Sequence, residues 1–225
     1  MNNKKKLDIL IIILLAFLLI ATVLIFVKFS IAKKLLSDSS KRIQQIQEKL
    51  NPQSQPLLTA PILRTSDPVS GQPTAEHTIF IFASFTCTYS QQQAEILNEL
   101  IKNYPSRFFI VWKDLASTKD STANNAAIAA RCAQEQNSFW LYHDYLYANQ
   151  ESLNSETYLS IANELGLDIN KFNSCLQSQE PVKLIASDLT EALALGLDAT
   201  PYLFIDGQRV DGVITLQSLE EALEL

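Results

Sequence analysis

Residues 82–90 of this chain read Phe82-Ala-Ser-Phe-Thr-Cys87-Thr-Tyr-Ser90, and they lie between an apolar run and a polar run. The apolar run, Thr78-Ile-Phe-Ile-Phe82, is typical of a buried strand, and the polar run, Gln91–Leu100, is typical of a helix. The pattern predicts a strand, a tight turn and a helix, with Cys87 in the first helical turn. Unpaired N–H groups and the helix dipole stabilise a thiolate there, and the thiolate is the nucleophilic form of cysteine.

Cys87 also has a second interpretation. A cysteine at the end of a buried strand is often a small, inert, apolar side chain. The position of Cys87 alone does not decide between the reactive and the inert interpretation. The rest of the chain has to decide between them.

The charge of the chain is distributed unevenly. The chain has 225 residues and a net charge of −6. Residues 1–34 contain six lysines and one aspartate, so they carry +5 and the remaining residues carry −11. Phosphate binding needs a basic surface, so this balance argues against nucleic acid as a partner and leaves proteins and small molecules. The length that follows the first apolar segment is enough for one domain with a sizeable core.

The N-terminal part is predicted to anchor the protein and to space its folded domain from the membrane. Residues 9–27 are apolar except for Thr22 and are long enough to span a bilayer as a helix. We interpret them as an uncleaved, single-pass signal anchor, preceded by a cytoplasmic tail at residues 1–8. A cleaved signal peptide would have a shorter apolar core and a clearer cleavage site. Residues 28–66 read as a helical spacer followed by a proline-rich linker.

The folded domain is predicted to comprise residues 67–225. Its first strands, at 77–85 and 107–112, are joined by a helix at 87–103, which makes them a parallel pair. Helices follow over about residues 121–195. The expected ranges there are 121–136, 138–149, 155–165 with Ser155 as its cap, a short helix after Asp168, and a helix from Pro181 with Val182, Ile185, Leu189 and Leu193 on one face. A hairpin at 201–205 and 208–213, with the turn Asp206-Gly207, precedes a last helix at 216–225.

Several short motifs occur between residues 65 and 225. They are Asp67-Pro-Val-Ser-Gly71, Phe82-x-Ser-Phe-x-Cys87, Ala129-Ala-Arg-Cys132-Ala, Phe139-Trp140, Tyr142-His-Asp-Tyr-Leu, Phe172-Asn-Ser-Cys175-Leu and Ala199-Thr-Pro201-Tyr-Leu-Phe-Ile-Asp-Gly207. In kind and order they resemble the DsbA family of extracytoplasmic thiol–disulfide oxidoreductases, including its membrane-anchored BdbD-like branch. The resemblance implies an α/β fold, a DsbA-like thioredoxin fold with a helical insertion, which here follows the single transmembrane helix expected at residues 9–27.

The resemblance also implies which residues position a substrate. It places Thr200 and Pro201, joined by a cis peptide bond, beside Cys87, where the Thr200 backbone can pair with an extended substrate segment. Judged from the residues alone, a trans proline that opens a strand is the simpler interpretation. Thr88 and Tyr89, which follow the cysteine, are expected to contribute to the same substrate-binding surface.

The other two cysteines, Cys132 and Cys175, have two possible roles. The resemblance implies a structural disulfide between them that ties two helices of the insertion together. The alternative is that one of them supplies a second thiol to the active site. A disulfide would leave Cys87 as the free thiol and would require an oxidising compartment. The disulfide interpretation therefore favours a domain outside the cytoplasm, at the cell membrane.

The active-site motif departs from the family pattern. The family usually has Cys-x-x-Cys, whereas this chain has Cys87-Thr-Tyr-Ser90. A second thiol normally resolves the mixed disulfide of an exchange reaction, and Ser90 cannot do so. Ser90 can instead donate a hydrogen bond to the thiolate. An acidic residue found near the site in some members has no evident counterpart, since Ile81 and Ser84 stand where it would be sought.

We therefore predict a thiol–disulfide oxidoreductase that uses the single thiol of Cys87 and favours reduction or isomerisation over net oxidation. Its expected partners are protein substrates with thiols or disulfides, and a small thiol or a membrane redox partner that resolves the mixed disulfide. No cofactor is expected, and the two histidines and scattered acids show no metal-ligand spacing.

Two alternatives remain open. One is a binding module, such as a chaperone, that kept the fold, lost turnover and holds extended segments of exported proteins. The other is an enzyme similar to the kappa-type glutathione transferases, which use a serine, although no residues here read as a glutathione site.

Overall fold

The computed structural model of this protein describes residues 33–34, 41, 58–116 and 119–225. By its internal contacts the chain divides into two units, Met1–Gln55 and Pro56–Leu225. In the first unit, the described residues are helical. The expected cytoplasmic tail and membrane anchor lie outside the described residues. Within the described part of the chain, no helix is both long enough and apolar enough to cross a membrane.

The second unit is built on a five-stranded sheet with the order β1-β3-β2-β4-β5. Strands β2 and β3 run parallel, and every other neighbouring pair is antiparallel. The predicted parallel pair and the predicted hairpin are therefore confirmed. The strands are β1 (Val69–Ser70), β2 (His77–Ala83), β3 (Phe108–Asp114), β4 (Tyr202–Ile205) and β5 (Gln208–Asp211).

The edge strand β1 was not among the predicted strands. It has two residues, which pair with Ile110 and Val111 of β3, and two residues are too few for an alternating pattern. Gly71 follows it with a φ of +87°, and a Cβ at that position would lie 2.0 Å from the carbonyl oxygen of Phe108. Only glycine allows so close an approach of the two backbones.

Helices cover both faces of the sheet. On one face, Leu97 of α2 (Thr88–Asn103) and Leu219 of α8 (Leu216–Ala222) share an apolar cluster with Ile81 of β2. On the other face, Phe82 of β2 shares a cluster with Ala192 of α7. Successive residues of a strand point to opposite faces, so β2 is apolar from Ile79 to Ala83 because both of its faces are covered there.

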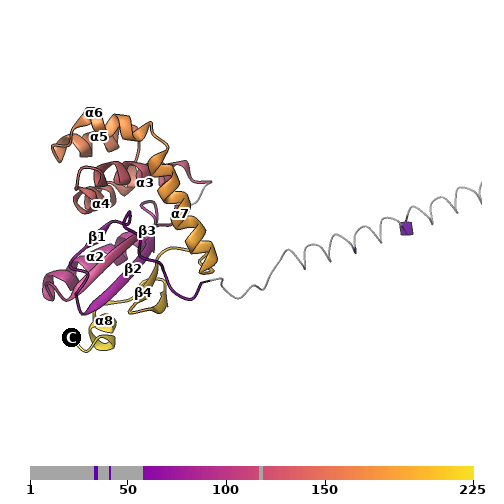
Figure 1. Ribbon diagram of the computed structural model, residues 1–225, viewed down its shortest axis with the longest axis vertical. Helices are drawn as coiled ribbons and strands as arrows, with labels where there is room; N and C mark the ends of the chain where they lie inside the picture. Colours follow the sequence, from indigo (N-terminus) through magenta and orange to yellow (C-terminus); the bar gives the residue numbers. More distant parts are fainter. Residues whose placement is uncertain (1–32, 35–40, 42–57, 117–118) are drawn as a thin grey trace, which may run out of the picture. The chain divides into compact units, whose positions relative to one another are not determined.

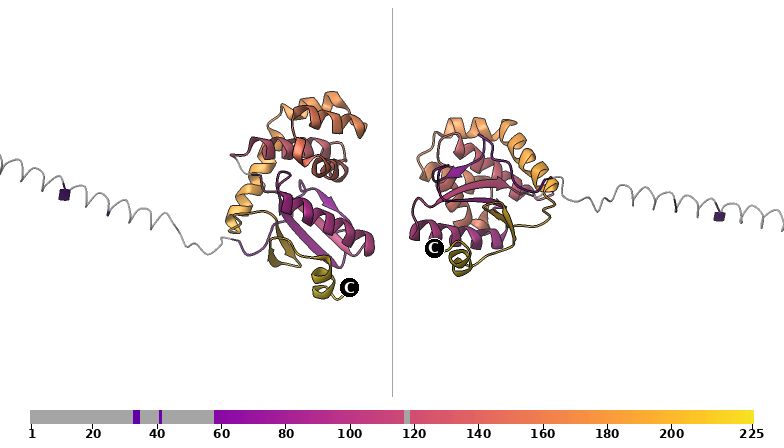
Figure 2. Two further views of the ribbon diagram at one scale, coloured as in Figure 1. Left: turned by 180° about the vertical axis from the view of Figure 1, so that it is seen from behind. Right: turned by 60° about the horizontal axis from the view of Figure 1, so that its bottom comes forward.

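A helical insertion separates β3 from β4. In Figures 1 and 2, α5 and α6 lie farthest from the sheet, and α7 runs from the insertion back to it. Asn154 caps α5 in place of the predicted Ser155, because its side chain accepts from the backbone N–H groups of Glu156 and Thr157. The insertion comprises α3 (Ser121–Gln134), α4 (Phe139–Ala148), η1 (Gln150–Ser152), α5 (Ser155–Glu164), α6 (Ile169–Leu176) and α7 (Glu180–Ala194).

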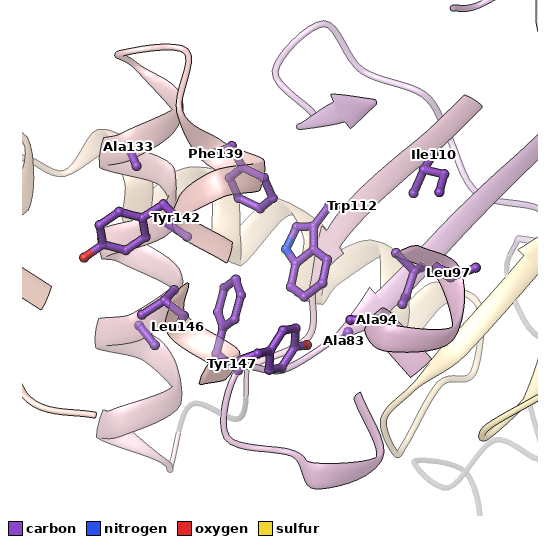
Figure 3. Packing of buried hydrophobic residues seen from close by; sticks show 14 of the residues in the cluster. Ala83, Ala94, Leu97, Ile110, Trp112, Ala133, Phe139, Tyr142, Leu146 and Tyr147 are labelled. Carbon is purple, nitrogen blue, oxygen red and sulfur yellow. The ribbon is translucent and has the colours of Figure 1, made fainter. Parts of the chain in front are cut away.

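Aromatic rings join the insertion to the sheet. Trp112 of β3 is fully buried, and its ring centroid lies 4.9 Å from Phe85 and 5.9 Å from Phe139 of α4. Figure 3 shows Phe139 and Tyr147 of α4 directed toward Trp112. Of the aromatic residues of α4, Phe139, Tyr142 and Tyr147 belong to the buried core cluster.

A buried ion cluster lies where β3, α3 and α7 meet. Lys113 is completely buried, and its Nζ lies 2.8 Å from Asp67 Oδ2 and 3.2 Å from Glu191 Oε2. Arg131 Nε lies 2.6 Å from Asp114 Oδ2, and its Nη2 lies 2.6 Å from Asp188 Oδ2. Charged groups can be buried where each has a partner of opposite sign. We define the buried ion cluster as Arg64, Asp67, Lys113, Asp114, Arg131, Asp188 and Glu191.

The buried ion cluster is bonded to residues that the sequence assigns to the linker. Arg64 pairs with Glu191, and the carbonyl oxygen of Ile62 accepts a hydrogen bond of 2.8 Å from Lys113 Nζ. Leu58 N–H donates to the carbonyl of Ala194 at 2.9 Å. The described residues 58–66 are thus held against the folded unit, because they supply partners for charges that the fold buries.

Candidate active site

Cys87 lies at the start of α2 as its N-cap residue, with φ −94° and ψ 117°. The sequence predicted Cys87 in the first helical turn, and the structure places it one position before that turn. Its N–H donates to the carbonyl of Ser84 at 3.2 Å, and its own carbonyl accepts from Gln91 N–H at 3.1 Å. The thiol is free and partly exposed. The turn therefore presents the sulfur to solvent at the N-terminal end of a helix of 16 residues.

The loop before β4 brings a second predicted residue to the cysteine. The peptide bond between Thr200 and Pro201 is cis, as the resemblance implied. The Sγ of Cys87 donates to the carbonyl oxygen of Thr200 at 3.4 Å. Thr88 and Tyr89 lie on the surface beside the sulfur, and Tyr89 is 66% exposed. Residues 113 positions apart in the sequence thus meet at one site.

The surroundings of Cys87 change the acidity of its thiol. Partial burial raises the pKa of Cys87, because burial disfavours the charged form. Hydrogen bonds from the side chains of Thr200 and Ser90, and from the backbone N–H groups of Ser90 and Tyr89, act in the opposite direction and outweigh burial. The pKa of Cys87 is therefore lower than the ordinary value of a cysteine, and a larger fraction is thiolate at neutral pH.

Ser90 lies behind the cysteine and is completely buried. Its Oγ accepts a hydrogen bond of 3.4 Å from the backbone N–H of Ser84. A hydrogen bond from the Ser90 side chain is among the interactions that lower the pKa of Cys87. The part of Ser90 in the chemistry of the thiol stays a prediction.

The other two cysteines are joined to each other. Cys132 of α3 and Cys175 of α6 form a disulfide, and their relative exposures are 0% and 4%. The pairing that the resemblance implied is present. In this form neither sulfur is available to attack a mixed disulfide at Cys87, which leaves the site with one thiol.

An apolar groove opens beside the cysteine. It has a volume of about 380 Å³ and is lined by Cys87, Thr200, Leu115 and the leucines 189, 193 and 197. The carboxylates of Asp120 and Asp198 also line it. Leu193 is 68% exposed, so the apolar face of α7 is only partly core. The sequence signal for this groove is the apolar stripe of α7, on which Leu189 and Leu193 were expected to lie.

The described residues hold no evident metal site. In this part of the chain, no three side chains of His, Cys, Asp or Glu gather as metal ligands would. The His143 ring instead packs between Trp112 and Tyr147, at centroid distances of 5.0 Å and 4.9 Å.

Comparison with known proteins places this site in context. A family model described as thioredoxin matches residues 64–225. A thioredoxin-like oxidoreductase from Silicibacter pomeroyi has a similar structure, with a TM-score of 0.65 at 24% identity over 72% of this chain and 92% of that one. BdbD from Bacillus subtilis, in its oxidised form, gives a TM-score of 0.64 at 15% identity over 71% of this chain and 91% of that one. Wolbachia pipientis α-DsbA1 gives 0.64 at 19% identity, covering 73% and 92%.

The curated relatives are larger proteins. The chain is 33% identical over 167 residues to the Na(+)/H(+) antiporter NhaA 3 of Salinispora tropica, and 27% identical over 168 residues to NhaA of Herminiimonas arsenicoxydans. The alignments cover 74% and 75% of this chain, but only 26% and 27% of the antiporters. The similarity thus concerns about a quarter of each antiporter.

Proposed function

This chain belongs to the thioredoxin family and has the DsbA-like form of its fold, and we propose that it exchanges thiols and disulfides through the single sulfur of Cys87. The observation that carries this proposal is the setting of the sulfur. It lies at the start of α2, 3.4 Å from the Thr200 carbonyl, with the pKa of the thiol below its ordinary value. A partly exposed thiolate beside a groove is poised to attack a disulfide bond.

The reaction proceeds in two exchanges. The Cys87 thiolate attacks one sulfur of a substrate disulfide, so that an S–S bond forms at Cys87 and the other substrate sulfur leaves as a thiolate and takes up a proton. A second thiolate then attacks the mixed disulfide and releases Cys87. If that thiolate comes from the substrate, the substrate is isomerised. If it comes from a small thiol or a redox partner, the substrate is first left in a mixed disulfide with that reductant. A further thiol then attacks this mixed disulfide, which frees the reduced substrate and leaves the reductant as its disulfide.

Net oxidation of a substrate is disfavoured at this site. An oxidant of the Cys-x-x-Cys type stores a disulfide between its two cysteines, and the second position here is Ser90. The nearest alternatives, Cys132 and Cys175, are already joined to each other. A site with one thiol supports reduction or isomerisation, because in these reactions the substrate, a small thiol or a redox partner supplies the thiol that resolves the mixed disulfide.

The substrate is proposed to be an extended protein segment that carries a thiol or a disulfide. It would lie along Thr200 and Pro201, with Thr88 and Tyr89 on the other side of the sulfur. The Tyr89 side chain is 66% exposed, which makes its ring available to a partner. The leucines of the groove would receive apolar side chains next to the reacting cysteine.

We further propose that the protein is anchored in the cell membrane and that its folded domain is extracytoplasmic. The apolar run at residues 9–27 supports an anchor, with residues 1–8 in the cytoplasm. The disulfide between Cys132 and Cys175 supports an oxidising compartment.

The test uses the full-length chain, purified in detergent, with the variant Cys87→Ser. A disulfide-bonded peptide is added, and mass spectrometry counts covalent adducts before and after addition of glutathione. The native protein is expected to form one adduct at Cys87, which glutathione releases as reduced peptide. The variant is expected to form none.

The matched control is the double variant Cys132→Ser/Cys175→Ser, which is expected to form the adduct as the native chain does. Adduct formation that persists in Cys87→Ser, or a native Cys87 that reacts with neither the peptide nor an alkylating agent, would refute the proposal.

A second candidate function is a binding module for extended segments. The observation that favours it is the apolar groove beside a site with no second thiol in its neighbourhood. This candidate predicts that peptide binding, measured without any covalent step, is equal in the native chain and in Cys87→Ser, and that neither reduces a peptide disulfide.

A further inference from the structure

The apolar stripe of α7 is covered only at its middle. Ile185 is 5% exposed, whereas Val182, near the start of the helix, is 40% exposed and Leu193, near its end, is exposed as well. Figure 1 shows that α7 runs from the insertion back to the sheet. Leu193 lines the groove beside Cys87, but Val182 does not line it. The groove therefore explains only one exposed end of the stripe.

A second apolar cavity lies at the other end of the stripe. It has a volume of about 180 Å³, and we name it the α3–α7 cavity. An apolar cavity of about 150 Å³ holds a molecule of the size of benzene, so this one is large enough for one apolar side chain. Its lining residues are Asn124 and Ile128 of α3, and Val182, Ile185, Ala186 and Leu189 of α7.

The α3–α7 cavity continues the groove. Leu189 lines both of them. On the facing helix, Ala123 lines the groove and its neighbour Asn124 lines the cavity. One apolar cluster also supplies residues to both, and its members are Ala116, Ala123, Ala127 and Ile185, with Ile128 packed against them. The seam between α3 and α7 is therefore one apolar surface that extends from the groove to Val182.

We propose that the α3–α7 cavity is a second substrate subsite, which binds an apolar side chain of the same extended segment whose cysteine reacts with Cys87. The inference rests on the proposed function, because it adds a requirement on the substrate of that site. The described residues that line the cavity carry no charge, which matches an apolar occupant. The substrate class is therefore a segment with a cysteine and a distant apolar residue.

The geometry of α7 sets the distance between these two features of the substrate. Val182 lies about three helical turns before Leu193, and at 1.5 Å per residue this is about 16 Å. An extended chain advances about 3.3 Å per residue, so about five residues cover the same length. The apolar residue should stand about four to six positions from the reacting cysteine. Because the seam leaves the groove in one direction, it should stand on one side of that cysteine only.

The experiment uses the full-length chain in lipid nanodiscs, because detergent would compete for an apolar cavity. The probes are glycine–serine peptides with one cysteine, activated as a mixed disulfide with thionitrobenzoate. The Cys87 thiolate attacks the peptide sulfur, an S–S bond forms between them, and the coloured thionitrobenzoate thiolate leaves. One leucine is placed at each position up to eight residues on either side of the cysteine. At the distal position, burial of the leucine is expected to raise the rate about threefold to tenfold over the peptide without leucine.

Two variants test whether this effect arises in the cavity. Val182→Asp removes an apolar wall in the first turn of α7, where a carboxylate is favourable for the helix. Ala186→Phe fills the cavity from an exposed position without adding a charge. Each variant is judged by the ratio of the rates with and without the distal leucine, so that a general change in the reactivity of Cys87 cancels. Both variants are expected to lower this ratio to about one.

The matched control is Leu141→Asp. Leu141 lies on α4, is 60% exposed and lines neither the groove nor the α3–α7 cavity. This variant also replaces an exposed apolar residue of a helix with aspartate, and it is expected to keep the native ratio.

Several results would overturn the inference. A crevice that only results from helix packing predicts equal rates at all distal positions. A ratio that survives in Val182→Asp and in Ala186→Phe, or that Leu141→Asp abolishes as well, would place the effect elsewhere. A cavity that receives a second copy of this chain would appear as a dimer that Val182→Asp dissociates, with no dependence on the leucine.

These outcomes are separate from failure of the proposed function. If the native Cys87 reacts with none of the peptides, the exchange proposal falls. The cavity is then tested by equilibrium binding of the same peptides with serine in place of cysteine. The distal leucine should tighten binding to the native chain about threefold to tenfold and should have no effect in Val182→Asp. Equal binding with and without the leucine would overturn the inference there too.

Discussion

The two sulfur sites of this protein differ in every property that governs thiol chemistry. Cys87 is partly exposed, lies at a helix start and is surrounded by hydrogen-bond donors. Cys132 and Cys175 lie inside the insertion and are bonded to each other. The contrast teaches that this protein uses cysteine sulfur once for reaction and once for stability. Differences in burial and in nearby hydrogen-bond donors separate the two uses. Three changes test that separation, in order of expected effect.

The largest effect is expected from Ser90→Cys, which gives the reactive site the second sulfur that only the structural site has. Serine and cysteine are similar in size, and position 90 already contacts Cys87. The variant should form a disulfide between residues 87 and 90 and should oxidise a dithiol peptide, whereas the native chain should not. Peptide oxidation, followed by mass spectrometry in the presence of oxidised glutathione, checks this.

A Ser90→Cys variant that forms its disulfide but oxidises no peptide would show that the site lacks more than a resolving thiol. The control is Ser90→Ala, which should remain unable to oxidise the dithiol peptide.

The second effect is expected from removing the structural site with Cys132→Ser/Cys175→Ser. The disulfide closes a loop between residues 43 positions apart, and a loop of this size contributes about 3 to 4 kcal/mol in the chain-entropy model. The free energy of unfolding, measured with urea, should fall by about that amount. The profile of Cys87 alkylation rate against pH should not change, and a shifted profile would mean that the two sulfur sites are coupled.

The smallest effect on either sulfur site is expected from Asp188→Asn, which alters only the buried ion cluster. Burial, helped by Asp114, raises the pKa of Asp188 to about 7, against the effect of Arg131. An unfolded aspartate has a pKa of about 3.9, so between about pH 4 and 7 the folded state keeps a proton that the unfolded state has lost. The free energy of unfolding should therefore fall as pH rises through this window, by up to about 1.4 kcal/mol per pH unit.

Asp188→Asn should lose this slope, and urea titrations at several pH values between 4 and 8 measure it. The Cys87 profile serves as the internal control, since it should be the same in both proteins. If the slopes of the native chain and the variant agree, Asp188 does not hold the proton.

The parts of the fold that were predictable are those with a strong local pattern. The apolar runs of β2 and β3 and the turn Asp206-Gly207 identify the central strands and the hairpin without any tertiary information. The end of β3 was misplaced, because Lys113 and Asp114 appear too polar for a buried strand. They are buried because charges from α3 and α7, distant in the sequence, neutralise them.

The candidate site was predictable only in part, because some of its contacts join residues that are distant in the sequence. The position of Cys87 before a helix is a local signal, whereas the proximity of Thr200 and the pairing of Cys132 with Cys175 came from family resemblance. Tyr147 lies in the helix expected at residues 138–149, and its ring is part of the core. Its hydroxyl acquires a partner at the active site, the carbonyl of Ser84, only through the packing of α4 on the sheet, and no pattern in the sequence records that contact.

The attachment of residues 58–67 has a mechanical consequence. Leu58 is bonded to Ala194 at the end of α7, and Arg64 and Asp67 pair with charges of α7 and β3. A pulling force along the chain from its N-terminal side therefore loads these contacts before it reaches the sheet. Because α7 leads directly into the loop that holds Thr200, a force applied to the chain before Leu58 would act on the helix that positions this loop.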